Sequence, residues 1–374
     1  MIVIPEVIIN ILLIIFAVLL FEFIILSHEF GHFITAKLSG IRVNEFALGM
    51  GPKLIHFKRG ETEYSLRAFP IGGFCAMEGE DESSDDPRAF GNKAVWKRIL
   101  VVVAGAVMNI LLGAVLMMVI TGQQSVFSST TVAEFTENSL TKQSGLRAGD
   151  EVVSINGYRV YTDRDMSFAL ASDQGIAQAL ESGDKLTVDM EVYRDGQVVA
   201  LNDVEFPRYT DTDGKNYLSI DFKAYGIEKN PWTLLKMSCS YTVSTVRMVW
   251  TSLVGLLTGK YGLNDMAGPI GAAQAIAQSA SQGLSVNVKT AINNILLMMT
   301  IITVNLGIVN LLPLSALDGG RLVFLLIELI FRKPVPAKYE GWVHAAGFVL
   351  LMVLMVVIAF SDVLRLVTGK GLGG

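Results

Sequence analysis

Two histidines and a glutamate stand together in a segment where hydrocarbon-facing residues are otherwise expected. The sequence HEFGH, residues 28–32, follows IINILLIIFAVLL, an apolar run that predicts a membrane-spanning helix. A charged residue at the centre of such a helix costs roughly 2.5–3.5 kcal/mol on insertion scales, so polar side chains there need a function. Residues four positions apart share one helix face, so His28 and His32 can present imidazole nitrogens to one Zn²⁺ ion. The H-E-x-x-H pattern therefore predicts a zinc site, with Glu29 placed to accept a proton from water.

A third ligand must come from another segment, because catalytic zinc usually takes three protein ligands and keeps one position for water. The strongest candidate is Asp318, the only acidic residue between Val286 and Glu328. Pro313 breaks a helix shortly before it, and two glycines follow it, where the backbone can bend toward a metal. Carboxylate oxygen is a suitable zinc donor beside imidazole.

Two alternatives stay open for these residues. Asp318 could instead cap a short helix, LVFLLIELIF, that begins just after it. The polar cluster in the first apolar segment could be a buried patch between helices that binds no metal. The remaining histidines, His56 and His344, are interpreted as interface residues rather than ligands.

The composition indicates a membrane protein. Hydrophobic residues make up 51% of the 374 residues, charged residues only 17%, and the mean hydropathy is +0.48. A formal charge of −5 without a long basic run predicts no nucleic-acid partner. Four segments reach the roughly 20 residues that a bilayer requires. They cover about residues 7–37, 95–122, 291–320 and 342–364.

Basic residues orient these spans. Lysines and arginines gather between the first two spans, over residues 37–98, and again after the third span, over residues 321–338. By the positive-inside rule both regions face the cytoplasm, which places both termini outside. The insert near residues 124–228 is then extracytoplasmic.

Three further regions have recognisable patterns. KLIHFK and EYSLRAF flank RGET and predict a β-hairpin around residues 53–69. GLRAGDEVVSINGYRV, residues 145–160, resembles the signature of a PDZ domain, which receives an extended peptide as an added strand; another small β-sandwich is the alternative. Residues 231–257 have apolar side chains at helical spacing, and we interpret them as an interfacial amphipathic helix rather than a fifth span.

Taken together, HEFGH in the first span and N-x-x-P-x-x-x-L-D-G in the third resemble the site-2 protease family. The second motif is formed by Asn310, Pro313, Leu317, Asp318 and Gly319. The likeness is closer to the bacterial branch that carries a PDZ insert and releases membrane-tethered anti-sigma factors. It extends over nearly the whole chain in the order of both motifs and segments.

The resemblance implies roles for individual residues. His28, His32 and Asp318 would bind zinc, and Glu29 would be the general base. Asn310 would hold the substrate backbone or the oxyanion. The stretch from Gly105 to Asn109 is similar to the family's GxxxN element, although Ala106 replaces a frequent proline. The small Gly105 would permit close helix contact, and Asn109 would hydrogen-bond within the core or bind substrate. The hairpin is similar to a membrane-associated β-element that takes up substrate as an added strand, with Tyr64 and Leu66 as its contact residues.

We therefore expect a polytopic α-helical membrane protein with four transmembrane helices, a membrane-associated β-hairpin and one inserted PDZ-like β-rich domain. It would lie in a bacterial inner or plasma membrane with its active site open to the cytoplasm. The expected parts are a first transmembrane helix with HExxH (1–37), a cytoplasmic loop with the hairpin (38–93), a second transmembrane helix (94–122), an extracytoplasmic PDZ-like domain (123–228), amphipathic linker helices (229–288), a third transmembrane helix with the LDG element (289–332), and a fourth transmembrane helix with the tail (333–374).

The expected activity is hydrolysis of a peptide bond in the transmembrane segment of a single-span membrane protein, such as an anti-sigma factor or a remnant signal peptide. The PDZ-like domain would bind a peptide or a substrate ectodomain. The rival interpretation is a non-catalytic membrane scaffold that recruits partners through its PDZ domain. A zinc transporter is disfavoured because the chain lacks repeated halves and a relay of acids through several spans.

Overall fold

A computed structural model describes residues 6–80, 82, 84–211, 214, 216–262 and 266–368. The chain divides into two compact units, one made of Met1–Leu116 with Val249–Gly374 and the other of Met117–Met248. The outermost residues of the expected 1–37 and 333–374 segments lie outside the described part. Each unit is treated by itself below.

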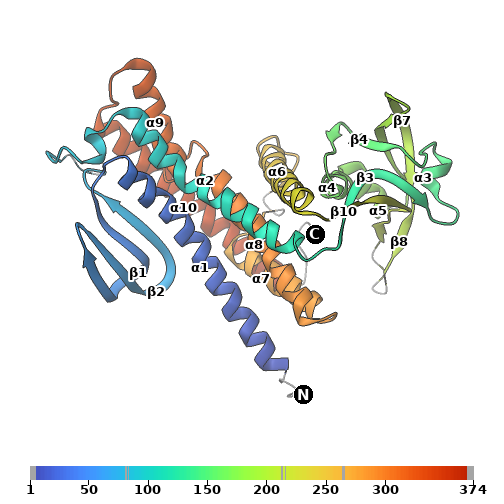
Figure 1. The fold of residues 1–374 in the computed structure, drawn as a ribbon, viewed down its shortest axis with the longest axis horizontal. Coiled ribbons are helices and arrows are strands. Elements are labelled where there is room, and N and C mark those ends of the chain that lie inside the picture. Colours follow the sequence, from blue (N-terminus) through green and yellow to red (C-terminus); the bar gives the residue numbers. More distant parts are fainter. Residues whose placement is uncertain are drawn as a thin grey trace. The chain divides into compact units, whose positions relative to one another are not determined.

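In the described part of the chain, four helices are long and apolar enough to cross a membrane. The candidate spans are Ile11–Leu38, Val95–Thr121, Val288–Asn310 and Lys338–Arg365. They belong to α1 (Glu6–Leu38), α2 (Val95–Thr121), α8 (Val288–Asn310) and α10 (Ala337–Thr368) (Figure 1).

The outward faces of these helices are apolar. Ile14, Leu19 and Val356 are 63%, 63% and 65% exposed. A continuous exposed apolar surface of this kind suits a lipid environment rather than water. With the family assignment reported below, the protein is a multi-pass membrane protein.

Small residues bring α2 and α8 into close contact. A Cβ added at Gly113 would lie 2.8 Å from Val304 Cγ2, and one at Gly307 would lie 2.9 Å from the Ala106 carbonyl oxygen. Glycine at these crossings lets the helix backbones approach, as is common between membrane helices.

The third apolar segment is shorter as a helix than its sequence suggests. The helix α8 ends at Asn310, a turn follows, and α9 begins at Asp318 (Asp318–Phe331). Pro313 lies in the turn and cannot donate a backbone hydrogen bond. The chain folds back so closely that a Cβ at Gly319 would lie 2.0 Å from the Leu312 carbonyl oxygen. This turn brings Asp318 back toward the other helices.

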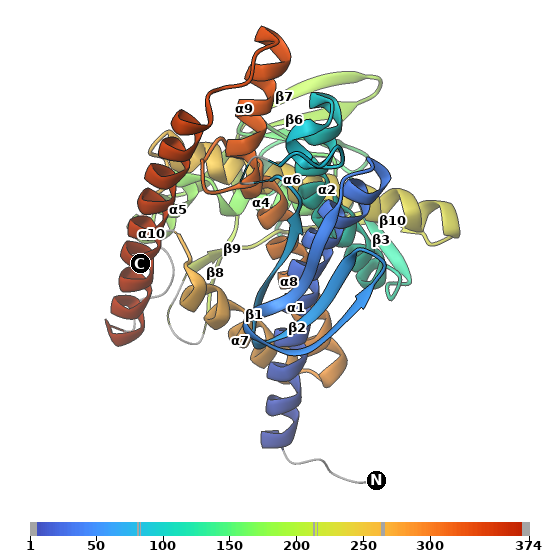
Figure 2. The ribbon, with the colours of Figure 1, turned by 90° about the vertical axis from the view of Figure 1, so that its left-hand side faces the viewer.

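The small sheet formed by β1 (Val43–Arg59) and β2 (Thr62–Met77) lies beside α1 in both views (Figures 1 and 2). Both strands bend near their middle, where Gly49, Gly51 and Gly72 have φ values of +81°, +86° and +89°. Because of these bends the pair presents four strand segments. Their order in the sheet, read from the residue pairing, is 53–59, 62–67, 45–48 and 73–77.

Tyr64 and Leu66 lie inside this sheet rather than at its edge. Leu66 is opposite both Leu48 and Ile55, and Tyr64 likewise has a neighbour on each side. Since both backbone edges are occupied, an added strand cannot pair there. The prediction that substrate adds at Tyr64 and Leu66 is therefore wrong. In the described part of the chain the outer segments of the sheet are 53–59 and 73–77.

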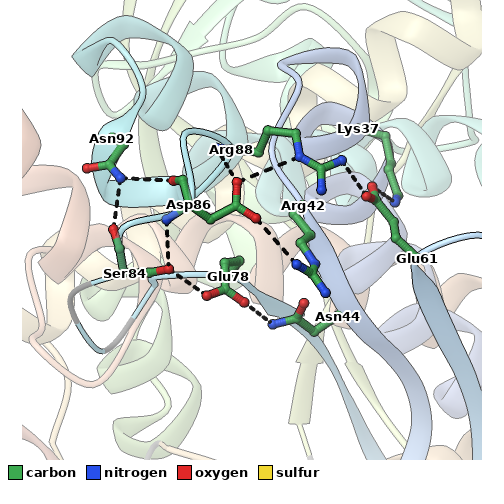
Figure 3. Close-up of polar contacts among 9 residues, drawn as sticks. All are labelled: Lys37, Arg42, Asn44, Glu61, Glu78, Ser84, Asp86, Arg88 and Asn92. Carbon is green, nitrogen blue, oxygen red and sulfur yellow. Dashed lines mark hydrogen bonds and ion pairs between the residues drawn. The ribbon is translucent and has the colours of Figure 1, made fainter.

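A polar network joins the tip of the sheet to the C-terminal end of α1 and to the loop before α2 (Figure 3). Glu61, in the turn between β1 and β2, accepts from Lys37 at 2.8 Å and from Arg88 at 2.5 Å. Asp86 pairs with Arg42 at 3.3 Å. These contacts hold the sheet against the helix that carries HEFGH.

The second unit is rich in β-structure. Its main sheet has the strand order β10-β3-β4-β6-β7, with β5 paired to β4. Alternating buried residues of this sheet pack with two helices around one apolar core. The elements are β3 (Val126–Phe135), α3 (Leu140–Gln143), β4 (Glu151–Ile155), β5 (Tyr158–Arg159), α4 (Asp163–Ala171), α5 (Gln174–Ser182), β6 (Leu186–Arg194), β7 (Gln197–Phe206), β8 (Arg208–Thr210), β9 (Asn216–Leu218) and β10 (Phe222–Glu228).

Two more helices follow this sheet, α6 (Pro231–Leu257) and, in the first unit, α7 (Pro269–Leu284). Within the second unit, α6 buries polar side chains such as Ser238 and Ser244 and exposes large apolar ones, with Trp232 70% exposed. This arrangement suits a helix whose outer face meets an apolar phase.

Candidate metal centre and active site

Three potential metal donors converge between α1 and the start of α9. His28 Nε2 lies 3.1 Å from Asp318 Oδ2, and His32 Nε2 lies 3.3 Å from the same oxygen. The two Nε2 atoms are 3.2 Å apart. Residues 290 positions apart in sequence thus meet at one point, because the turn after α8 returns the chain to α1.

His32 is oriented by the backbone of α2. Its Nδ1 donates to the Val101 carbonyl oxygen at 2.8 Å. A carbonyl only accepts, so Nδ1 carries the proton and the Nε2 of the neutral ring presents a lone pair toward Asp318. A second partner of this kind is the usual way in which a metal-binding histidine is held.

Gly105 of α2 makes room for both rings. A Cβ added there would lie 2.4 Å from His32 Nε2 and 2.8 Å from His28 Nε2. Any side chain at this position would occupy the space where the donors meet. Sequence reasoning assigned Gly105 only to close helix contact, and this more specific steric requirement was missed.

The two predicted asparagines lie on different sides of His28. Asn310, at the end of α8, places Nδ2 3.3 Å from His28 Nε2 and borders the cavity described below. Asn109 is fully buried, and its amide is 3.3 Å from His28 Nδ1. Because Asn109 lies behind the ring and is closed to solvent, its position favours orienting His28 over the predicted contact with substrate.

Glu29 lies on the side of α1 that faces β2. A Cβ built on Gly73 would be 3.5 Å from Glu29 Cγ and 2.9 Å from the Ala47 carbonyl oxygen. The first distance is ordinary van der Waals contact, so β2 packs directly against α1 here, while the second shows that the glycine is required by the close approach of β1. Glu29 therefore has the outer sheet segment 73–77 as its neighbour, next to His28 in the chain.

A cavity of about 240 Å³ opens beside the donors. Its lining includes His28, Asn310, Asp318, Arg321 and His344. Polar groups thus surround a space large enough for water within an apolar helix bundle.

The structure also brings His344 into this cavity, although the sequence analysis interpreted it as an interface residue. Its Nδ1 donates to the Ser315 carbonyl oxygen, in the turn that precedes Asp318. The only signal available from sequence was its scarcity, since it is one of four histidines in the chain.

The donor set fits zinc. Two donors at roughly 2.0–2.1 Å from a tetrahedral zinc ion lie about 3.3–3.4 Å from each other. The three separations of 3.1–3.3 Å among His28, His32 and Asp318 match this spacing. Two imidazoles and one carboxylate are also a donor set of the catalytic type.

Comparison with known proteins agrees with this chemistry. The model of peptidase family M50 matches residues 16–354. A protein of Clostridium acetobutylicum that carries the name of a zinc metalloprotease is 38% identical over 353 residues, covering 94% of this chain and 97% of its own length. The regulator of sigma-W protease RasP of Bacillus subtilis is 28% identical over 432 residues, covering 93% of this chain and 97% of its own.

The site and the comparisons together define a zinc metalloprotease. The chain belongs to peptidase family M50, so the predicted likeness to site-2 proteases is confirmed, as is the predicted zinc cofactor. With a family of enzymes assigned, the alternative of a non-catalytic scaffold is set aside.

Proposed function

We propose that this protein is an intramembrane protease that cuts a peptide bond in the transmembrane segment of single-span membrane proteins. His28, His32 and Asp318 would hold zinc, and Glu29 would act as the general base. The observation that carries the proposal is the meeting of three donor atoms within 3.3 Å of one another among helices apolar enough to lie in a bilayer.

Each residue has a task that follows from its position. Bound zinc would polarise the scissile carbonyl and lower the pKa of water from 15.7 toward about 7. Glu29 would take the proton of the attacking water and pass it to the leaving nitrogen. Asn310, at the cavity, would donate its amide N–H to the substrate carbonyl oxygen. When His28 Nε2 binds a metal, its Nδ1 would carry the proton. The Nδ2 of Asn109 lies 3.3 Å from this Nδ1 and the Asn109 Oδ1 has no hydrogen-bond partner among the described residues, so a turn of the amide would bring the oxygen round to accept from Nδ1.

The substrate would bind as an extended strand along residues 73–77 of β2. A bond inside a transmembrane helix is protected because its carbonyl is satisfied internally, so local unwinding must precede cleavage. An outer strand segment can replace the lost main-chain hydrogen bonds. This segment is favoured over 53–59 because Gly73 lies against Glu29.

The topology of the proposal follows the distribution of basic residues. The loop between α1 and α2 and the stretch after α9 would face the cytoplasm, and water would reach the site from that side. The unit rich in β-structure would be a PDZ-like domain outside the cytoplasm that binds a peptide or a substrate ectodomain. One of the two edge strands of its main sheet, β10 or β7, would accept such a peptide.

The substrate class is proposed from the name of a relative, and not from a contact that the structure shows. A relative is named as a regulator of sigma-W protease. Single-span proteins already shortened on the outer side, such as anti-sigma factors or remnant signal peptides, would suit a buried site of limited size.

The decisive experiment is reconstitution in lipid vesicles with a single-span test substrate that has either a long or a short outer domain. Wild type should cut the short form. Glu29→Gln should lose about 10²–10⁴-fold in rate while keeping its zinc content, because only the proton transfer is removed. Cleavage by the Gln variant at the wild-type rate would refute the assignment of the base.

Strand addition is tested by single prolines at Phe74, Cys75 and Ala76. Neighbouring N–H groups of a strand point to opposite sides, so at least one of these positions removes an outward donor. That variant should lose cleavage of the membrane substrate and retain zinc. Full activity of all three would exclude pairing at this segment.

A further inference from the structure

His344 is the one histidine that lines the metal cavity without being part of the donor set. It comes from α10, which is remote in sequence from both HEFGH and Asp318. Its ring centroid lies 5.6 Å from that of Phe324 of α9, so the imidazole is packed between α10 and the segment that follows the third donor. The question is what this position does for the site.

Its hydrogen bond is made to the turn that carries Asp318. The Nδ1 of His344 donates to the carbonyl oxygen of Ser315, three residues before the carboxylate. The Nε2 is closed to solvent and has no hydrogen-bond partner among the described residues; its nearest carboxylate oxygen, Glu340 Oε1, is 3.6 Å away. The contact with Ser315 is therefore the one directional bond of this ring.

Ser315 is enclosed by backbone on two sides. A Cβ added at Gly347 of α10 would lie 2.6 Å from Ser315 Oγ, and one at Gly320 of α9 would lie 2.5 Å from Ser315 Cα. The turn is thus packed between α9 and α10, and the Nδ1 of His344 donates to its Ser315 carbonyl oxygen.

We propose that His344 is a positioning residue for zinc binding, which acts through Ser315 to hold the turn from Leu311 to Leu317 and hence the carboxylate of Asp318. The docking of α10 and the assembly of the metal site are then one event. When the bond to Ser315 is lost, the turn becomes free to move Asp318 away from His28 and His32. The proposal rests on the metal site described under the proposed function.

The test compares three substitutions of His344 in the full-length protein in detergent. Zinc affinity is measured by competition with a chelator, and amide hydrogen exchange of residues 311–317 is measured in the metal-free protein. His344→Ala should bind zinc about 10–100-fold more weakly, the range found when a supporting partner of a ligand is removed, and should exchange faster in this turn.

The conservative variants separate positioning from simple packing. His344→Asn can place an N–H near the position of Nδ1 and should recover most of the affinity, whereas His344→Gln reaches further and should not. His56→Ala is the matched control, because His56 lies in β1, is 61% exposed at its side chain, and contacts Glu63 instead of the site.

The outcomes are distinguishable. If His344→Ala keeps wild-type zinc affinity, or if Asn and Gln behave alike, the inference is overturned. If Asp318→Asn also leaves zinc affinity unchanged, the failure lies in the proposed metal site itself.

Discussion

Two aspartates, one in each unit, are surrounded by very different partners. In the unit rich in β-structure, Asp150 is 1% exposed and accepts two hydrogen bonds of 2.7 Å from the guanidinium of Arg194, with a third from the Arg147 N–H. In the membrane unit, Asp318 faces two imidazole nitrogens at 3.1 and 3.3 Å. The first carboxylate meets a permanent cation, and the second meets two rings of which one presents a lone pair.

The difference separates a structural carboxylate from a ligand. Burying a charge is costly unless a counter-charge and hydrogen bonds accompany it. Asp150 has both within the chain. Asp318 shares its site with nitrogen atoms that can themselves donate electron pairs, so the favourable counter-charge is a metal ion. Asp318 is also the less buried of the two, with its side chain 29% exposed against 1% for Asp150, but it is the partners that distinguish a ligand from a structural carboxylate.

The strongest test of the difference between the two aspartates is to replace each of them by alanine. Asp318→Ala should abolish zinc retention and reduce cleavage by at least about a thousandfold, since the site loses one of three ligands. Asp150→Ala should leave zinc content intact but destabilise its own unit by about 3–5 kcal/mol, because Arg194 is left without its partner. Metal analysis and denaturant unfolding of the full-length protein measure both. Loss of zinc in the Asp150 variant would contradict the distinction.

A substitution at Gly105 tests whether the space between the imidazoles is required. Gly105→Ala places a methyl group 2.4 Å from His32 Nε2 and should weaken zinc binding by at least about a hundredfold. Gly113→Ala is the matched control on the same helix, because its methyl group would meet Val304 instead. Equal zinc affinity in the two variants would show that steric access to the donors is unimportant.

The role of Asn109 behind His28 predicts a smaller effect. Asn109→Ala removes the partner of His28 Nδ1 and should lower zinc affinity about 10–100-fold, with a matching fall in cleavage at limiting zinc. Excess zinc should restore most of the activity, since the group would act on metal binding and not on substrate. An Asn109 variant with normal zinc affinity and a raised KM would instead restore the original assignment to substrate binding.

The smallest effect is expected when the pH is lowered, which protonates Asp150, the aspartate that is paired with Arg194. Burial tends to raise the pKa of Asp150, but its hydrogen bonds with Arg194 and the Arg147 N–H outweigh burial and lower the pKa below its ordinary value. The ion pair therefore stabilises its unit fully above about pH 4, the value for an unfolded aspartate, and loses this contribution as the pH falls through the lowered pKa. Hydrogen exchange near residues 150–155 should report the loss, and Asp150→Asn should show a weaker pH dependence.

The sequence predicted the donors but not how they are held. Spacing of four residues placed His28 and His32 on one face, and the lone acid after a helix break identified Asp318. Spacing and composition could not predict three contacts that hold these donors. They are the hydrogen bond of His32 to Val101, the clearance at Gly105 and the hydrogen bond of His344 to Ser315. Each joins segments whose distance along the chain says nothing about their distance in space.

The hairpin also has features that the sequence predicts and features that only the tertiary structure decides. Its two strands were predicted from turn residues and alternation, which are local signals. Their bends at Gly49 and Gly72, and the folding of each strand back on its partner, decided that Tyr64 lies inside the sheet and residues 73–77 lie at its outer side.

The amino-acid sequence by itself determined which chemical groups this protein has, their period along a helix, and the apolar segments that carry them. These properties depend on neighbours within a few residues and on the transfer of side chains from water to lipid. Only the tertiary structure decided which nitrogen of each histidine faces Asp318, which glycines leave room for the donors, and which strand segments form the outer sides of the small sheet. Those features depend on helix crossings and sheet order. At such contacts between distant segments, a difference of a fraction of an ångström in the distance decides which side chain fits.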